Sequence, residues 1–147
     1  MTDHFTLAEL THSDKAIELG IDNTAYGELT LGSLLTLANG LEQVRMLLGH
    51  PMHINSGYRS QALNRAVKGV SNSDHLLGYA ADFVCPGFGT PREIVRAIVA
   101  SDIDFGQCIM ECNKWVHISF KPPTSREVLI ATSIDGEMHY SKWEDHA

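Results

Sequence analysis

The sequence of 147 residues suits one domain spanning residues 1–147, and its 44% apolar content excludes a disordered chain. Its net charge of −7 argues against nucleic acid as a partner, because phosphate groups require a basic surface, and against docking on anionic lipid. We expect a monomer that recognises its partner through a local pocket.

The cysteines and the N-terminus bear on the compartment. Cys85, Cys108 and Cys112 form no CxxC pair, so we expect buried free thiols rather than a disulfide framework or a cysteine metal site. Residues 1–5 lack the apolar region of a signal peptide, and no apolar run is long enough to span a membrane. The sequence predicts a protein made in the cytoplasm without its own export signal.

The first third of the chain predicts helices. Thr6 and Ser13 can each cap a short helix, because their hydroxyl groups can accept hydrogen bonds from backbone N–H groups of the first turn. Apolar residues then recur at helical spacing over 31–48, which predicts the longest helix, and Gly49 ends it.

The rest of the chain is predicted to alternate between strands and helices and then to form strands only. We expect a strand over 52–55, a helix over 61–68, a loop over 70–79, a strand over 80–85 and a helix over 91–101. Two hairpins should follow, over 107–120 and 127–140, and a flexible tail after about residue 141. This order predicts an α+β fold in which N-terminal helices pack on a small antiparallel sheet.

A histidine and an aspartate seven residues apart stand out in the string Ser73-Asp-His75-Leu-Leu-Gly78-Tyr-Ala80-Ala-Asp82. Asp82 falls on an apolar strand, where burying an unpaired carboxylate is costly and a cation would compensate it. Gly78 would allow the chain to turn so that His75 reaches back over Asp82.

A second histidine, His117, interrupts the apolar strand Trp115-Val-His117-Ile-Ser119. A single buried histidine is more often a hydrogen-bonded core residue than a metal ligand. However, two histidines and one carboxylate with an open fourth position are the ligand set of a catalytic zinc. Spacing alone leaves these two interpretations evenly balanced.

These motifs resemble those of the M15 zinc peptidases, which include D-Ala-D-Ala carboxypeptidases, dipeptidases and phage endolysin peptidases. The first motif is Ser73-x-His75-x-x-Gly78-x-Ala80-x-Asp82, followed by Trp115-x-His117. The string Ser56-Gly57-Tyr58-Arg59-Ser60 with Asn64 is similar to the upstream motif of that family. The opening residues 5–10 resemble the small carboxypeptidase branch found in phages and prophages, and the resemblance extends to about residue 130.

The resemblance implies a Zn2+ ion held by His75, Asp82 and His117. It implies that Arg59 faces the substrate and holds its carbonyl oxygen or terminal carboxylate, for which a guanidinium group is suited. Ser73 would line the pocket beside the metal, whereas Tyr58 could be either a pocket wall or a core aromatic. The implied fold is that of D-Ala-D-Ala peptidases, shared with the zinc site of Hedgehog signalling domains.

The general base is harder to assign. In some branches of the family a carboxylate lies three residues before the last histidine, but here that position is Lys114. Glu111 is the best candidate, and it shares a sheet face with His117 only if the loop between their strands has an odd number of residues. The alternative is that Glu111 is a solvated strand residue.

Two hypotheses follow for function. The first is a zinc peptidase that cuts a peptidoglycan stem peptide, either between D-Ala and D-Ala or between L-Ala and D-Glu. Of these two bonds, the one between D-Ala and D-Ala is preferred, because a compact site with Arg59 and zinc suits a terminal carboxylate. The enzyme could serve a phage or prophage in lysis, travel in a virion, or recycle the wall of its own cell. The second hypothesis is a non-catalytic, zinc-stabilised module that binds the cell wall or a partner.

Overall fold

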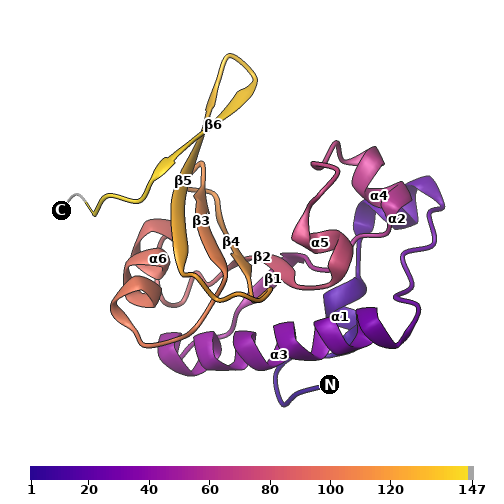
Figure 1. Cartoon of the computed structure of the whole chain (residues 1–147), viewed down its shortest axis with the longest axis horizontal. Helices are drawn as coiled ribbons and strands as arrows, with labels where there is room; N and C mark the ends of the chain where they lie inside the picture. Colours follow the sequence, from indigo (N-terminus) through magenta and orange to yellow (C-terminus); the bar gives the residue numbers. More distant parts are fainter. Residues whose placement is uncertain (146–147) are drawn as a thin grey trace.

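The computed structural model describes residues 1–145, which form six helices and six strands (Figure 1). This arrangement confirms the α+β class. The helices are α1 (Leu7–Thr11), α2 (Asp14–Leu19), α3 (Glu28–Leu48), α4 (Gln61–Ala66), α5 (Asp74–Leu77) and α6 (Pro91–Ala100). The strands are β1 (His53–Ser56), β2 (Ala80–Val84), β3 (Gln107–Glu111), β4 (Trp115–Ser119), β5 (Glu127–Ile134) and β6 (Glu137–Lys142).

The strands form one sheet in the order β1-β2-β4-β3-β5-β6. The prediction of an antiparallel sheet is wrong at one pair, because β5 runs parallel to β3. The reason lies in where β4 ends: Ser119 pairs with Gln107, the first residue of β3. The short connection over 120–126 therefore starts β5 at the same end, where Glu127 pairs with Gln107.

One face of the sheet is covered by α3 and α6 (Figure 1). Alternate strand residues point into this core, where they meet the apolar stripe of α3 and the buried face of α6. The fully buried residues of this layer include Leu34, Leu37, Leu41, Phe83, Ile94, Ile98, Val116 and Ile118. Each such side chain contributes about 1.5–3 kcal/mol relative to exposure, so this face supplies the stability and leaves the opposite face for other roles.

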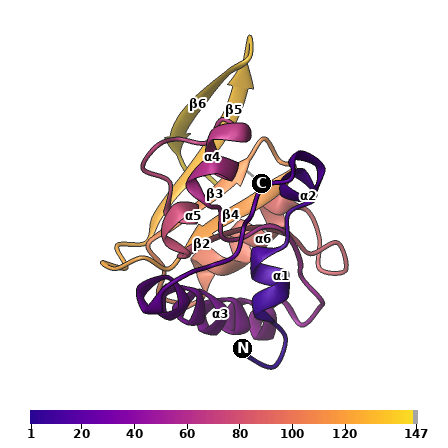
Figure 2. The ribbon, with the colours of Figure 1, turned by 90° about the vertical axis from the view of Figure 1, so that its right-hand side faces the viewer.

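The opposite face carries α4 and α5, which lie in front of the sheet in Figure 2. The predicted loop over 70–79 is wrong in its middle, because residues 74–77 form the one-turn helix α5. Ser73 caps this turn by accepting a hydrogen bond from the His75 N–H group (3.2 Å), and Gly78 ends it with φ 85°. These caps stabilise a helix too short to leave a periodic pattern in the sequence.

Element ends differ from the predictions by a few residues. Helix α3 begins three residues before the predicted 31, and α4 ends at Ala66 rather than at 68. Helix α6 begins with a capping box formed by Thr90 and Glu93. Such differences are ordinary, because helix ends depend on capping geometry more than on apolar spacing.

The C-terminal hairpin of β5 and β6, predicted over 127–140, turns at Asp135-Gly136 and projects beyond the other strands (Figure 1). The tail expected to be flexible after about residue 141 makes contacts as far as Asp145. The Trp143 N–H group donates to the Val128 carbonyl oxygen (3.0 Å), and Arg96 pairs with Asp145 (2.8 Å). Residues 146 and 147 lie outside the described part.

Other predictions of the sequence can be compared directly. Within residues 1–145, no helix is both long enough and apolar enough to cross a membrane. The three cysteines are free thiols; Cys85 and Cys108 are buried and Cys112 is half-buried. The described histidines outside the motifs are exposed: His4, His12, His50, His53 and His139, with His146 outside the described residues.

Candidate metal centre

His75 is held in a fixed orientation by the loop that precedes it. Its Nδ1 atom lies 2.7 Å from the carbonyl oxygen of Gly57. In the other direction, the Arg59 N–H group donates to the His75 carbonyl oxygen (3.1 Å). Only 2% of His75 is exposed. The strings around Gly57 and His75, separated in the sequence, thus form one unit.

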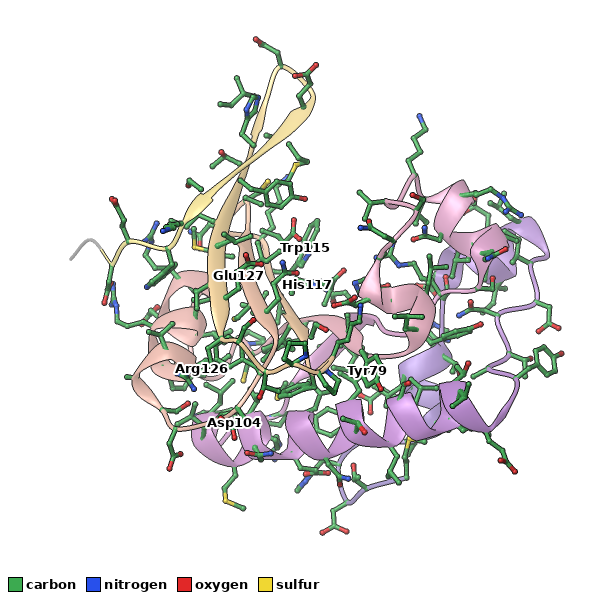
Figure 3. The ribbon with its side chains drawn as sticks, viewed as in Figure 1. Tyr79, Asp104, Trp115, His117, Arg126 and Glu127 are labelled. Carbon is green, nitrogen blue, oxygen red and sulfur yellow. The ribbon has the colours of Figure 1, made fainter. Side chains whose placement is uncertain are left out.

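Asp82 and His117 face each other on adjacent strands, because they are register partners in β2 and β4. Asp82 Oδ1 lies 3.0 Å from His117 Nδ1 and 3.2 Å from His75 Nε2. Figure 3 shows His117 projecting from β4 toward the side of the sheet on which α5 lies. The structure therefore brings together all three predicted metal ligands, with their ligand atoms within 4.8 Å of one another.

The donor set can be tested for its fit to a metal. Gly57 offers only an oxygen acceptor, so His75 Nδ1 must carry a proton and donate it. In neutral His75 the lone pair of Nε2 then points at the Asp82 carboxylate, and two acceptors 3.2 Å apart repel each other unless a cation lies between them. Ligand atoms about 2.1 Å from a tetrahedral zinc lie roughly 3.4 Å apart, close to these separations. The residues fit Zn2+.

Without a metal, the two histidines already favour the ionised form of Asp82. Burial alone would raise the pKa of the Asp82 carboxyl, but His75 and His117 outweigh burial and hold the pKa well below its usual range. The carboxylate is therefore ionised, as a metal ligand must be. Among the described residues this group has three members, which leaves room for a fourth ligand from outside the chain.

Asp74 lies beside His75 in the sequence but does not contact its imidazole ring, because Gly57 already occupies that position. Instead, Asp74 Oδ2 accepts a hydrogen bond from the Ser119 hydroxyl group (2.7 Å), and Lys121 Nζ lies 3.9 Å from Oδ1. This bond joins α5 to β4. It therefore ties together the elements that carry the two histidines, a role that the sequence did not reveal.

The register of β3 and β4 decides where Glu111 points. Ile109 pairs with His117, and Glu111 pairs with Trp115, so the connecting loop is 112–114. This loop has an odd number of residues, and Glu111 shares the sheet face of His117, as required of a base. Lys114 is exposed in the turn. Burial, followed by the charge of Asp82, raises the pKa of the Glu111 carboxyl, although His117 and Arg59 oppose the shift.

Arg59 is half-buried beside this centre. Its Nε atom is buried and finds no hydrogen-bond acceptor among residues 1–145. Burial lowers the pKa of the guanidinium group, and the carboxylates of Asp82 and Glu111 oppose that shift, so Arg59 lies within their electrostatic reach. A buried cation with an unused donor is suited to an anionic ligand.

The two remaining predicted site residues, Ser73 and Tyr58, make contacts that support the fold around the centre. Ser73 is the cap of α5, so its hydroxyl group supports His75 directly. Tyr58 packs against the hydrophobic core, which favours the core-aromatic alternative. A residue that the sequence analysis missed, Asn23, fixes this loop: its side chain donates to the carbonyl oxygens of Thr11 and Tyr58 and accepts from the Ser60 N–H group. Asn23 lies between α2 and α3, outside the motifs that the sequence analysis singled out.

Two histidines and an aspartate with ligand atoms within 4.8 Å of one another, and a half-buried glutamate on the same sheet face, fit a metallohydrolase centre. The model of the peptidase M15 family matches residues 3–119, a span that contains all of these side chains. The chain belongs to the M15 peptidase family, whose members are generally zinc-dependent. A search of curated proteins found no match.

Proposed function

We propose that this protein is a zinc peptidase that hydrolyses a stem peptide of bacterial peptidoglycan, with His75, Asp82 and His117 as the metal ligands. The observation that carries the proposal is the pair of acceptors, His75 Nε2 and Asp82 Oδ1, held 3.2 Å apart by a carbonyl group that fixes the imidazole tautomer. Membership of a peptidase family supports a peptide as the substrate.

When bound, zinc would supply a Lewis acid that polarises the scissile carbonyl group and acidifies the attacking water. Glu111 takes the proton from that water and passes it to the nitrogen of the leaving amine. Its raised pKa suits the first of these transfers, because a carboxylate of higher pKa takes up a proton more readily. Ser73 maintains the turn that presents His75 and, in this proposal, lines the pocket beside the metal.

Arg59 supports a carboxypeptidase in preference to an endopeptidase. Its buried and unpaired Nε atom is matched by a carboxylate that a guanidinium group can bind through two parallel hydrogen bonds. The D-Ala-D-Ala terminus of a stem peptide offers such a carboxylate next to the scissile bond. An L-Ala-D-Glu endopeptidase is the second candidate, because the D-Glu side also carries a carboxylate. Tyr58 would then support the Arg59 loop from the core side.

A non-catalytic zinc module is the alternative from another class. Such a module needs no base and would fill its metal with a fourth protein ligand. Glu111 on the ligand face, and three rather than four candidate ligands within residues 1–145, favour catalysis.

The wider setting belongs to the same proposal. We propose one domain with the fold of D-Ala-D-Ala peptidases and of the zinc site of Hedgehog signalling domains, acting as a monomer on the cell wall and without nucleic acid. Release during phage or prophage lysis, transport in a virion and recycling of the cell's own wall are the three settings that this proposal allows.

Digestion of purified peptidoglycan, with mass analysis of the products, tests the proposal. We expect release of free D-Ala by the zinc-loaded wild type and none by Glu111→Gln, which should still contain zinc. Dipeptide or larger fragments without free D-Ala would favour the endopeptidase. Intact wall with a tightly held metal would favour the binding module.

A further inference from the structure

The C-terminal hairpin lies outside residues 3–119, which the family model matches, yet it extends the sheet next to Glu111. Strand β5 pairs with β3, the strand that carries Glu111, and β6 forms the outer edge. Figure 1 shows this hairpin on one side of β3 and β4, with α4 and α5 on the other. Whatever this segment adds to the site therefore comes from outside the family-matched residues.

One row of side chains crosses the sheet from the site to the hairpin. Glu111 pairs with Ala131, and Ala131 pairs with Tyr140. Neighbours in register point to the same face of a sheet, so Tyr140 shares the face of Glu111 and His117. Two strand spacings, about 10 Å, separate the backbones of Glu111 and Tyr140. The residue between them is a small, buried alanine, which leaves the tyrosine ring free to lean toward the site.

Tyr140 is available for a ligand. Its exposed fraction is 55%, so more than half of its surface is open to solvent. Partial burial, followed by the charges of Glu111, Cys112 and Asp82, raises the pKa of its phenol. The carboxylates of the metal centre are therefore close enough to act on it.

Arg59 and Tyr140 lie on opposite sides of the candidate metal centre. Arg59 belongs to the loop that contacts His75 on the β2 side of His117, whereas Tyr140 is on β6, beyond β3 and β5. A peptide whose terminal carboxylate is held by Arg59 would extend across Glu111 toward β6. The residues before the scissile bond would then reach the tyrosine.

We infer that Tyr140 is a substrate-positioning residue that contacts the stem peptide on the N-terminal side of the scissile bond, an inference that rests on the proposed function. Its ring packs against the peptide, and its hydroxyl group donates to a peptide carbonyl oxygen. A tyrosine provides both contacts at low entropic cost, since it has few rotatable bonds.

Two substrates of different length test this inference on the zinc-loaded protein. The first is a stem pentapeptide ending in D-Ala-D-Ala, and the second is acetyl-D-Ala-D-Ala, which lacks the residues that would reach β6. We expect Tyr140→Ala to raise KM for the pentapeptide about tenfold, which corresponds to about 1.4 kcal/mol, and to change KM for the short substrate less than twofold. Tyr140→Phe should show part of the effect if the hydroxyl group contributes.

His139→Ala is the matched control, because His139 neighbours Tyr140 on β6 but points to the other face of the sheet. Calorimetric binding of the pentapeptide to metal-free Glu111→Gln protein, with and without Tyr140→Ala, gives a readout independent of turnover. Equal affinities and an unchanged pentapeptide KM would overturn the inference. An equal loss for both substrates would also overturn it, because that result indicates a distorted sheet. A wild type that neither binds nor cuts either peptide would instead disprove the proposed function, and this inference with it.

Discussion

The hydroxyl group of Ser119 donates a hydrogen bond to the Asp74 carboxylate across 2.7 Å, although 45 residues separate the two in the sequence. Asp74 opens the turn that carries His75, and Ser119 ends the strand that carries His117. Neither residue is one of the three candidate metal ligands. Their bond sets the distance between two ligand-bearing elements, so it should influence metal affinity without contacting the metal.

Ser119→Ala should therefore reduce both stability and zinc affinity. We expect a loss of about 1–2 kcal/mol in the free energy of unfolding, because Ser119 is fully buried and its partner loses a hydrogen bond. Zinc affinity should fall roughly tenfold. Urea unfolding and competition with a zinc-binding dye measure the two effects. Asp74→Asn keeps an oxygen acceptor and should bind zinc more tightly than Asp74→Ala; equal affinities would show that the bond has no such role.

Loss of a metal ligand should have a larger effect. His117→Ala and Asp82→Asn should each lower zinc affinity by more than the roughly 10–100-fold expected when an outer-shell partner is lost. Metal content after dialysis measures this. His53→Ala, which removes an exposed histidine from β1, is the control and should retain zinc. Undiminished zinc in both ligand variants would rule out the assigned set.

Glu111→Gln should lower activity but raise the stability of the metal-free protein. Removing the proposed base should lower kcat by about 10²–10⁴-fold. The raised pKa of Glu111 means that its ionised form is disfavoured in the folded protein, so ionised Glu111 opposes folding at pH values above the ordinary carboxyl pKa of 4.5. The metal-free variant should therefore be more stable than metal-free wild type at pH 7, and the difference should vanish as the pH falls below 4.5.

Urea unfolding across this pH range measures the second effect. Glu137→Gln, at an exposed position of β6, should leave stability and activity unchanged. A fully active Glu111→Gln enzyme would remove Glu111 from the mechanism, whatever its stability.

Arg59→Lys should weaken substrate binding while zinc remains bound. A lysine keeps the positive charge but cannot make two parallel hydrogen bonds to a carboxylate. Losing one charged hydrogen bond costs about 1.5–3 kcal/mol, so kcat/KM should fall roughly 10–100-fold. Arg65→Lys, at an exposed position of α4, is the matched control. Equal kcat/KM values for the two variants would contradict a substrate role for Arg59.

Gly78→Ala should destabilise the turn that presents His75. Gly78 has φ 85°, and an added Cβ atom would lie 3.2 Å from Leu34 Cγ and 3.3 Å from the Thr30 carbonyl oxygen. Gly136 has φ 81° but nothing within 4 Å, so Gly136→Ala measures the backbone cost alone, about 1–2 kcal/mol. The first variant should lose more stability than the second, and it should also lose zinc. Equal losses would show that α3 yields to the added methyl group.

The sequence predicted the parts of the fold that depend on local pattern. The capping box of Thr90 and the apolar stripe of α3 are signals within a few residues, and both elements formed where expected to within three residues. The parallel placement of β5 was not predictable in this way, because it depends on which strand edge is free once β4 has paired with β2 and β3. Helix α5 was missed because one turn has no periodicity.

The candidate site was likewise predictable only where its signal is local in the sequence. The costly carboxylate of Asp82 and the histidine in an apolar strand were visible as local anomalies, and the structure brings them together with His75. The acceptor that fixes His75 is a backbone carbonyl group, and no side chain in the sequence identifies it. Asn23 and Ser119 act through long-range contacts, so their residue types alone gave no signal.

The Gly57 carbonyl group that fixes His75 sits in a loop anchored from the N-terminal region, through the bond from the Tyr58 N–H group to the Leu10 carbonyl oxygen (2.8 Å). An added Cβ atom at Gly57 would overlap that same oxygen, so α1 and this loop are in direct contact. Occupation of the centre by an ion would hold His75, the Gly57 loop and α1 in one cooperative unit. Amide hydrogen exchange at Tyr58 and Arg59 should consequently slow when zinc is added, which makes two backbone amides remote reporters of the metal.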